Sequence, residues 1–259
     1  MLLAIDVGNT ETDLGLFQGD RLSWTWRMAT GRRRTPDELA LLFGGFLAQQ
    51  GLSFSREISG VAIASVVPDQ TQALREMVRD YFHFPPVVVE PGVKTGIPIL
   101  LDNPKEVGAD RIVNALAAFA KYGGPCVVVD VGTATTYDAV TERGEFVGGA
   151  IAPGLQVAAE GLFSATARFT RVELVQPRAV IGKSTVEALQ SGLLYGTAAE
   201  IDGMVERIQK ELGGDAIVVA TGGLAGVVVP ACHGVDHHDP FLTLEGLRLI
   251  FEKNTARDE

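Results

Sequence analysis

Two aspartates stand at matching places in two similar stretches of this chain. Asp6 and Asp130 each end an apolar run, and each is followed by Val-Gly and then by residues with amide or hydroxyl side chains. A carboxylate beside a glycine and such donors is suited to holding a phosphate and its magnesium ion, because the glycine lets the backbone approach the anion. Either aspartate alone is equally explained by an Asx turn. Because the whole pattern occurs twice, we favour two phosphate-binding turns that serve one nucleotide.

Each aspartate is predicted to lie in a hairpin, between two strands. Residues 12–17 and 22–28 follow the first turn with a strand-like pattern, and the Gly-Asp dipeptide between them is typical of a two-residue hairpin turn. Residues 137–140 and 146–151 follow the second turn in the same way. The two halves of the chain therefore repeat one plan.

The common glycine-rich phosphate loops do not occur in the sequence. Gly-x-Gly-x-x-Gly and Gly-x-x-x-x-Gly-Lys-Ser/Thr both place a phosphate at the N-terminus of a helix, and neither pattern is present. Rossmann and Walker-type nucleotide sites are therefore excluded.

Helices and further strands surround these turns. Thr35 to Glu38 form a capping box with proline at the first helical position, and apolar residues then recur at helical spacing until near Gly51. Further helices are predicted at 71–82, 106–121 and, with interruptions, 184–212, and further strands at 58–67, 87–90 and 216–220. This alternation is typical of an α/β protein.

The charge of the chain argues against a nucleic-acid partner. Its 259 residues carry a formal net charge of -10 with a pI near 4.9, whereas binding to nucleic acid needs clustered Lys and Arg. The one basic run is Arg32-Arg33-Arg34, just before the predicted helix start at Thr35. A solvated loop is the simpler interpretation of this run, and contact with a phosphate is the alternative.

The cysteines and the hydropathy indicate a cytoplasmic protein. Cys126 and Cys232 are too few for a disulfide framework and lack the spacing of metal ligands. No apolar run reaches the length of about 18 residues that a membrane helix needs, and no basic region precedes the first strand. We therefore expect no membrane partner.

Five ordered motifs, spread over nearly the whole chain, occur together. They are Asp6-Val7-Gly8-Asn9-Thr10, residues 103–111 (NPKEVGADR), 130–136 (DVGTATT), 148–154 (GGAIAPG) and 181–185 (IGKST). This set resembles type III pantothenate kinase, as does the closing segment 242–247. Five motifs in order are far more specific than a lone glycine loop.

The resemblance implies a fold. The two Asp-Gly hairpins, with the adenosine-type motif at Gly222-Gly223, are similar to the actin, hexokinase and Hsp70 ATPases. We expect an α/β fold of two tandem ribonuclease-H-like domains, each a mixed sheet flanked by helices. The first would span 1–115 with the first phosphate hairpin. The second would span 116–259 with the second hairpin and the adenosine motif, and its last helix is a candidate to pack back on the first domain.

The resemblance also implies an activity, the ATP-dependent phosphorylation of pantothenate to 4'-phosphopantothenate, the first step of coenzyme A biosynthesis. Phosphoryl transfer needs positioning, neutralised charge and a group that takes the hydroxyl proton. Asp110 is the implied catalytic base, near the start of a predicted helix and after a glycine that allows close approach. The implied pantothenate-binding segment is Gly108, Ala109, Asp110 and Arg111. An ordinary surface helix is the alternative for this pair of charges.

By the same resemblance, ATP and two cations have assigned residues. The ATP-binding residues are Asp6, Val7, Gly8, Asn9, Thr10, Glu11, Thr12, Asp13 and Thr133. Asp6 helps to hold Mg²⁺, directly or through water, since one or two carboxylates suffice for this ion. Asp130 is the ligand of a monovalent cation, K⁺ or NH₄⁺, which would add positive charge beside the developing phosphoryl charge.

Two further residues concern the substrate. Thr185 is the family's additional pantothenate contact, and its alternative role is helix capping, for which Ser184 is the better residue. Many family members carry a Tyr two residues before the Asn-Pro, in the loop that covers pantothenate, whereas this chain has Leu101. Loss of that hydroxyl would remove one hydrogen bond, about 0.5 to 1.5 kcal/mol, or be offset from elsewhere. The family also implies a homodimer with pantothenate enclosed near the subunit interface.

Two other functions stay open. The Bvg accessory factor group shares this fold and family and is described as regulatory, so the chain could be a non-catalytic partner-binding protein. The presence of Asp6, Asp110 and Asp130 argues for catalysis instead. The other alternative is a kinase of the same fold that acts on another small hydroxy acid. The match at Gly108 to Arg111 is the main argument against it.

One cluster has the residue types of a metal site. Asp236-His237-His238-Asp239 contains good ligands for zinc and similar ions. The glycine and proline that flank it favour a solvated loop before the last helix.

Overall fold

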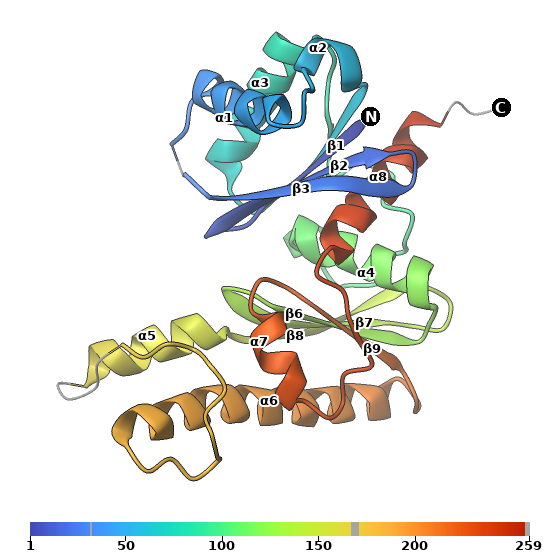
Figure 1. The fold of residues 1–259 in the computed structure, drawn as a ribbon. Coiled ribbons are helices and arrows are strands. Elements are labelled where there is room, and N and C mark those ends of the chain that lie inside the picture. Colours follow the sequence, from blue (N-terminus) through green and yellow to red (C-terminus); the bar gives the residue numbers. More distant parts are fainter. Residues whose placement is uncertain (32, 167–170, 257–259) are drawn as a thin grey trace. The chain divides into compact units, whose positions relative to one another are not determined.

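The computed structural model describes residues 1–31, 33–166 and 171–256, which form two compact units. The first unit comprises Met1–Ile97, Asn103–Ala117 and the chain from Thr243 onward. The second unit comprises Pro98–Asp102 and Ala118–Leu242. Figure 1 traces the chain through the elements of both.

The first unit is built on a mixed sheet. Its strands are β1 (Leu2–Val7), β2 (Glu11–Gln18), β3 (Arg21–Ala29), β4 (Gly60–Ser65) and β5 (Val87–Val88), in the spatial order β3-β2-β1-β4-β5. β1, β2 and β3 form an antiparallel meander, whereas β4 is parallel to both β1 and β5. The first predicted hairpin is therefore present.

The second unit repeats this sheet. Its strands are β6 (Cys126–Val131), β7 (Ala134–Val140), β8 (Phe146–Pro153), β9 (Ile217–Thr221) and β10 (His237–His238), in the order β10-β9-β6-β7-β8. β6, β7 and β8 are again antiparallel, and β9 is parallel to β6 and β10. Read from the β8 edge, the order is that of the first sheet. The predicted fold of two mixed sheets flanked by helices is confirmed.

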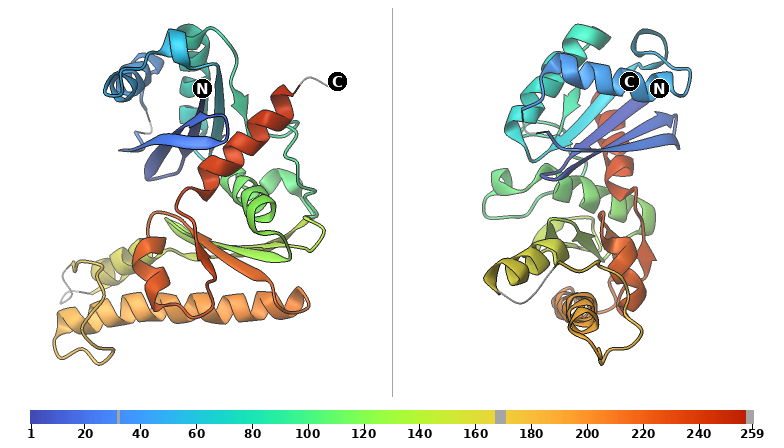
Figure 2. Two further views of the ribbon diagram at one scale, coloured as in Figure 1. Left: turned by 45° about the vertical axis from the view of Figure 1, so that its right-hand side comes forward. Right: turned by 60° about the vertical axis from the view of Figure 1, so that its left-hand side comes forward.

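Helices cover both faces of the first sheet. Figure 2 shows α1 (Pro36–Ala48) and α3 (Pro68–Phe82) side by side on one face, with the short α2 (Phe54–Glu57) beside them. Their apolar stripes bury Leu39, Phe43 and Leu74 against β1 and β2. The other face meets α8 (Leu242–Thr255), whose Leu244 lies against Gly15 of β2. Burial on both faces explains why β1 and β4 read as nearly continuous apolar runs.

The second sheet is covered chiefly by one long helix. α6 (Thr185–Glu211) runs along the face onto which Val127, Val129 and Tyr137 point. The fully buried Tyr137 hydroxyl donates to Glu200 of this helix at 3.1 Å. α5 (Leu155–Ala165), α7 (Ala225–Val228) and a 3-10 turn at Val229–Ala231 complete the unit.

Several boundaries differ from the sequence-based predictions. α3 begins at Pro68 and not at 71, because proline fits the first helical position, where no backbone N–H is needed. The predicted helix 106–121 is a 3-10 turn at Pro104–Glu106 followed by α4 (Ala109–Tyr122). α5 is not predicted by the sequence pattern, since it buries only Leu155 and Ala159 and its N-cap residue, Gly154, has no side chain to cap it.

Candidate active site

The first Asp-Gly segment forms a tight turn between β1 and β2. The Gly8 N–H donates to the Glu11 carbonyl at 2.9 Å, and a Cβ on Gly8 would lie only 3.1 Å from that oxygen. Asn9 and Thr10 are exposed at the tip, whereas Asp6 is half-buried on β1. The turn thus presents polar groups to a ligand from a rigid base, as a phosphate site requires.

Thr30, just beyond the end of β3, is hydrogen-bonded to this turn. Its hydroxyl donates to the Gly8 carbonyl at 2.8 Å and lies 2.8 Å from the hydroxyl of the buried Thr12. Its N–H donates to the Thr10 carbonyl at 2.8 Å. The loop that follows β3 therefore starts directly at the phosphate turn.

A row of charged residues crosses the sheet at the same end. Strand register places Asp13 opposite Asp6 and Arg27 opposite Asp13. Arg27 Nε lies 2.6 Å from Asp13 Oδ1, and its Nη1 lies 3.2 Å from Glu11 Oε2. The bond to Asp13 raises the pKa of Arg27. Two facing carboxylates fit a hard cation such as Mg²⁺, which prefers oxygen ligands and keeps several waters.

The second Asp-Gly segment also forms a tight turn, between β6 and β7, which is one residue shorter than the first. The Gly132 N–H donates to the Ala134 carbonyl at 3.0 Å, and Thr133 is exposed at the tip. The Gly154 N–H donates to the Thr133 carbonyl at 3.1 Å, and a Cβ on Gly154 would lie 2.3 Å from the Gly132 carbonyl oxygen. The start of α5 is therefore packed on the turn with no room for a side chain.

The glycine pair after β9 meets this second turn. Asp130 is half-buried and lies opposite Thr221 in the parallel pair of β6 and β9. A Cβ on Gly222 would lie 2.4 Å from Asp130 Oδ1, and the backbone at Gly222 has a φ of +98°. The Leu224 N–H donates to the Val131 carbonyl at 3.0 Å. The structure thus brings Asp130 together with the segment that resembles an adenosine motif.

Asp110 is the second residue of α4 and is largely screened from solvent. Its Oδ1 accepts the Arg111 N–H at 2.9 Å. Burial raises the pKa of Asp110, and the bond from the Arg111 backbone partly opposes that rise. A carboxylate with a raised pKa is better suited to take a proton than a fully solvated one.

Asp110 lies near the end of β1 that carries Asp6. A Cβ on Gly108 would lie 2.4 Å from Asp110 Oδ1 and 3.8 Å from Val66 Cγ1. The Val66 N–H in turn donates to the Val7 carbonyl at 3.1 Å. Two of the three predicted carboxylates, Asp6 and Asp110, therefore stand at the same end of the first sheet.

Thr185 is the first residue of α6 and is exposed. The cap of this helix is Ser184, whose Oγ accepts the Glu187 N–H at 3.2 Å, so the hydroxyl of Thr185 is not used for capping. Thr185 lines an open cavity of about 580 Å³ whose other lining residues are Gly182, Lys183, Ser184, Ala188 and Leu189. Thr185 is thus available to a ligand.

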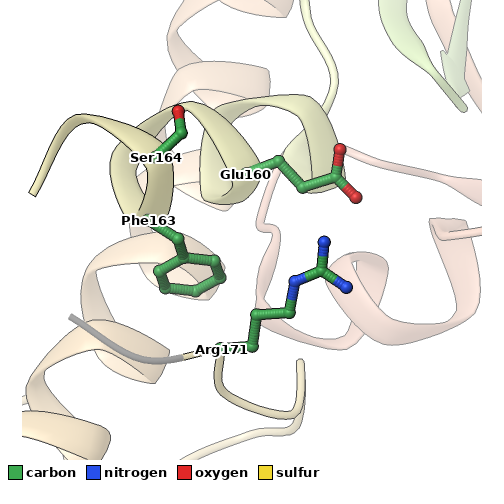
Figure 3. Close-up of a pocket in the computed structure, with 4 residues that line it drawn as sticks. All are labelled: Glu160, Phe163, Ser164 and Arg171. Atoms are coloured by element: carbon green, nitrogen blue, oxygen red, sulfur yellow. The ribbon is translucent and has the colours of Figure 1, made fainter.

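A second cavity involves none of the predicted site residues. It has a volume of about 320 Å³ and is lined by Glu160, Phe163 and Ser164 of α5 and by Arg171. Figure 3 shows the charged ends of Glu160 and Arg171 facing each other across it. Because it holds no Asp-Gly turn and its one carboxylate, Glu160, faces Arg171, it is not the candidate active site.

Leu101 packs against the edge of the second sheet. The Leu100 N–H donates to the Phe146 carbonyl at 2.8 Å, and the Phe146 N–H donates to the Pro98 carbonyl at 2.8 Å. Leu101 Cδ2 would lie 3.4 Å from a Cβ on Gly148 of β8. The loop is therefore held by backbone bonds that do not depend on the residue type at 101.

The side chains of Asp236 to Asp239 are not gathered around a common position in the structure. No group of three or more His, Cys, Asp or Glu residues in the described part of the chain is arranged to hold a metal ion. His237 stacks on Tyr122 with ring centroids 4.5 Å apart. The prediction of a solvated loop is wrong for Asp239, which is buried and accepts from Lys121 at 2.7 Å and from the Tyr122 hydroxyl at 3.0 Å.

Two residues of the site region are not predicted from the sequence, Arg27 and Thr30. The strand register pairs Asp6 with Asp13 and Asp13 with Arg27. A predicted register for the β1-β2 and β2-β3 hairpins would therefore have placed Arg27 in this row. Of the basic run, Arg32 lies outside the described residues, Arg33 is exposed and Arg34 is half-buried.

No helix among residues 1–31, 33–166 and 171–256 is long and apolar enough to cross a membrane.

This chain is similar to proteins of known family and to proteins of known structure. A family model described as type III pantothenate kinase matches residues 2–207. A type III pantothenate kinase from Frankia casuarinae is 56% identical over 98% of this chain and 100% of its own length. A solved Baf family transcriptional activator from Campylobacter jejuni matches with a TM-score of 0.58 at 19% identity, over 97% of this chain and 98% of that one.

A second solved structure gives the same fold. The ROK hexokinase from Thermus thermophilus matches with a TM-score of 0.54 at 13% identity, over 97% of this chain and 98% of that one. At these identities the two solved structures show the fold alone, and only the relative and the family model bear on the reaction.

Proposed function

We propose how this chain phosphorylates pantothenate, on the premise that it belongs to the type III pantothenate kinase family, as the match over residues 2–207 and the 56% identical relative show. The reaction transfers a phosphoryl group from ATP to pantothenate and gives 4'-phosphopantothenate, in the first step of coenzyme A biosynthesis. The observation that carries the residue assignments is the position of the screened Asp110 carboxyl beside the β1 end that bears Asp6.

In this proposal the first turn binds the phosphates of ATP. The segment from Asp6 to Asp13 supplies exposed donors at Asn9 and Thr10 and a backbone held by Thr30. Thr133, exposed at the tip of the second turn, is a further ATP contact. Preorganised donors of this kind stabilise charge without reorganising at the moment of reaction.

The substrate hydroxyl loses its proton to Asp110. Burial holds the pKa of this carboxyl above its usual range, which raises its affinity for the proton. Gly108, Ala109 and Arg111 border it and bind pantothenate, and Thr185 adds a hydroxyl contact from the start of α6. An attacking oxygen freed of its proton can then take the γ-phosphoryl group in line with the leaving ADP.

Two cations complete the proposed chemistry. Asp6, with Asp13 opposite, fits Mg²⁺, which would neutralise charge on the phosphates when bound. Asp130 fits a monovalent cation, K⁺ or NH₄⁺, through its half-buried carboxylate. Both cation sites are supported by the same observation, a carboxylate beside a glycine turn. Such a turn offers an oxygen ligand to the cation and lets a phosphate approach the backbone.

A homodimer is also proposed. Support comes from exposed apolar side chains gathered before and at the start of α6 in the second unit, namely Val175, Val180, Ile181 and Val186. Large exposed apolar side chains in one region are typical of interaction sites. A cytoplasmic location belongs to the same proposal and agrees with two unpaired cysteines.

A coupled assay of ADP release, with pantothenate and ATP in magnesium buffer, tests the reaction. We expect turnover that depends on pantothenate. Equal rates with other hydroxy acids would point to a different acceptor, and no turnover from folded protein would favour a regulatory role.

Potassium is expected to raise the turnover rate about tenfold or more over sodium, because it adds fixed positive charge beside the transferred phosphoryl group. The measurement is the same assay with KCl or NaCl at equal ionic strength. Asp130→Asn should abolish the difference between the two salts. A potassium effect that survives in this variant would place the ion elsewhere.

Leu101→Tyr is expected to lower the KM for pantothenate about two- to tenfold with little change in kcat. The new hydroxyl supplies the hydrogen bond that many relatives have, worth about 0.5 to 1.5 kcal/mol. The matched control is Leu100→Tyr, next to it and more than half exposed, which should leave both constants unchanged. An unchanged KM in Leu101→Tyr would show that another group already makes this contact.

A further inference from the structure

Arg34 is a half-buried cation held in one place beside the first phosphate turn. Its N–H donates to the Gly31 carbonyl at 3.2 Å, and its side chain folds back so closely that a Cβ on Gly31 would meet Arg34 Nε at 2.4 Å. Its carbonyl accepts from the buried Gln70 at 3.4 Å. Its Nη1 lies 3.5 Å from the sulfur of Met28. The side chain is therefore held beside Gly31 and Met28, and the backbone of Arg34 is anchored at both its N–H and its carbonyl.

Within the described residues this guanidinium has no carboxylate partner. The acids closest in sequence are both engaged: Glu38 accepts from the Thr35 N–H at 2.8 Å in the capping box, and Asp37 accepts from the Tyr81 hydroxyl at 2.7 Å. The chain has ten more acidic than basic charges, so an unneutralised, half-buried arginine is unexpected. Charged groups that lose solvent are usually paired, and a missing protein partner points to an anionic ligand.

The contacts of Arg34 lead directly to the phosphate turn. Met28, which it touches, lies opposite Thr12 in the pairing of β2 and β3. Thr12 shares a hydroxyl contact of 2.8 Å with Thr30, and Thr30 donates to the Gly8 carbonyl. These contacts link the guanidinium to the first phosphate turn through Met28, Thr12 and Thr30.

We propose that Arg34 binds the phosphate oxygens of the ATP held by the first turn. This inference rests on the proposed function and adds a residue that the resemblance does not assign. A planar guanidinium with several donors matches phosphate oxygens, and its bonds are charge-assisted. Because its position is fixed before ATP arrives, little side-chain freedom is lost on binding. Arg34 is a nucleotide-binding residue in this scheme and plays no part in pantothenate binding.

The test is ATP binding by calorimetry to the intact protein, with Mg²⁺ and without pantothenate, at two salt concentrations. Arg34→Gln should weaken ATP binding about 10- to 100-fold and reduce the dependence of affinity on salt. Arg34→Lys should recover part of the affinity, since it restores the charge but not the paired donors. The KM for pantothenate should stay within about twofold.

Two matched controls lose the same charge elsewhere in the first unit. Arg21→Gln changes an exposed arginine at the opposite end of β3, whose Nη2 donates to Gln18 at 2.9 Å. Arg33→Gln changes the exposed neighbour of Arg34. Both should bind ATP within about threefold of the wild type, because both arginines are exposed and screened by solvent.

The outcomes separate this inference from the proposed function. If the wild type binds ATP and transfers its phosphoryl group to pantothenate but Arg34→Gln binds ATP equally well, the role of Arg34 is refuted and the kinase assignment stands. If the wild type binds no ATP, both fail. Should Arg34→Gln lower the melting temperature, Arg34→Met keeps the packing on Met28 without the charge, and normal ATP affinity in that folded variant would refute the proposal.

Discussion

Replacing Asp110 by Asn is expected to lower kcat about 10²- to 10⁴-fold and to leave the affinity for ATP unchanged. The substitution keeps the shape of the side chain and the bond from the Arg111 N–H, which the amide oxygen can still accept at about the observed 2.9 Å. It removes only the capacity to take the substrate proton. Turnover and ATP binding, measured on the same preparation, therefore separate a role in proton transfer from a role in nucleotide binding.

Asp69→Asn is the matched control. Asp69 is also the second residue of a helix in the first unit, α3, but it is exposed. This variant should keep wild-type kcat. If Asp110→Asn instead lost ATP binding along with turnover, Asp110 would be a nucleotide or folding residue and the proposed base would have to be sought elsewhere.

Asp110→Asn is expected to lower kcat but not to lower the stability of the protein. Burial raises the pKa of Asp110 above its ordinary value of 3.8, so the folded state binds the proton more tightly than the unfolded state does. The ionised carboxylate therefore costs stability, and this cost grows as pH rises from the unfolded pKa to the folded pKa and is constant above it. Asp110→Asn should be at least as stable as the wild type in urea at neutral pH, with the difference disappearing at acidic pH.

The hairpins could be predicted because their signals are local. Period-two apolar patterns and turn residues specify β1 to β3 and β6 to β8 without help from distant segments. The duplication supports this prediction, since each half repeats the pattern of the other. The strand order and the parallel pairing with β4 and β9 were not predicted and come from the structure.

The features that the sequence did not predict depend on distant contacts. Asp239 is buried because Lys121 and Tyr122, more than a hundred positions earlier, supply its donors. Arg27 joins the row of Asp6 only through the register of two hairpins. The raised pKa of Asp110 comes from burial, which composition and spacing do not report. The burial and the contacts of the site residues therefore could not be predicted without the fold, even where the residues themselves had been identified from the sequence.

Gly222→Ala is expected to destabilise the second unit strongly. The backbone there has a φ of +98°, which an L side chain adopts only with strain, and the new methyl would lie 2.4 Å from Asp130 Oδ1 and 2.6 Å from the Val131 carbonyl oxygen. The carboxylate can rotate away, but the backbone of β6 cannot. We expect a loss of several kcal/mol in the free energy of unfolding, roughly 2 to 5.

Activity should fall for a second reason, because the displaced Asp130 no longer offers its carboxylate to a monovalent cation. Any folded Gly222→Ala protein should therefore show equal rates in potassium and sodium. Gly226→Ala is the control, since a methyl there would make only an ordinary contact of 3.6 Å with His238 and would sit in α7, changing stability by about 1 kcal/mol or less. Wild-type stability and potassium response in Gly222→Ala would contradict the tight packing of this glycine on Asp130.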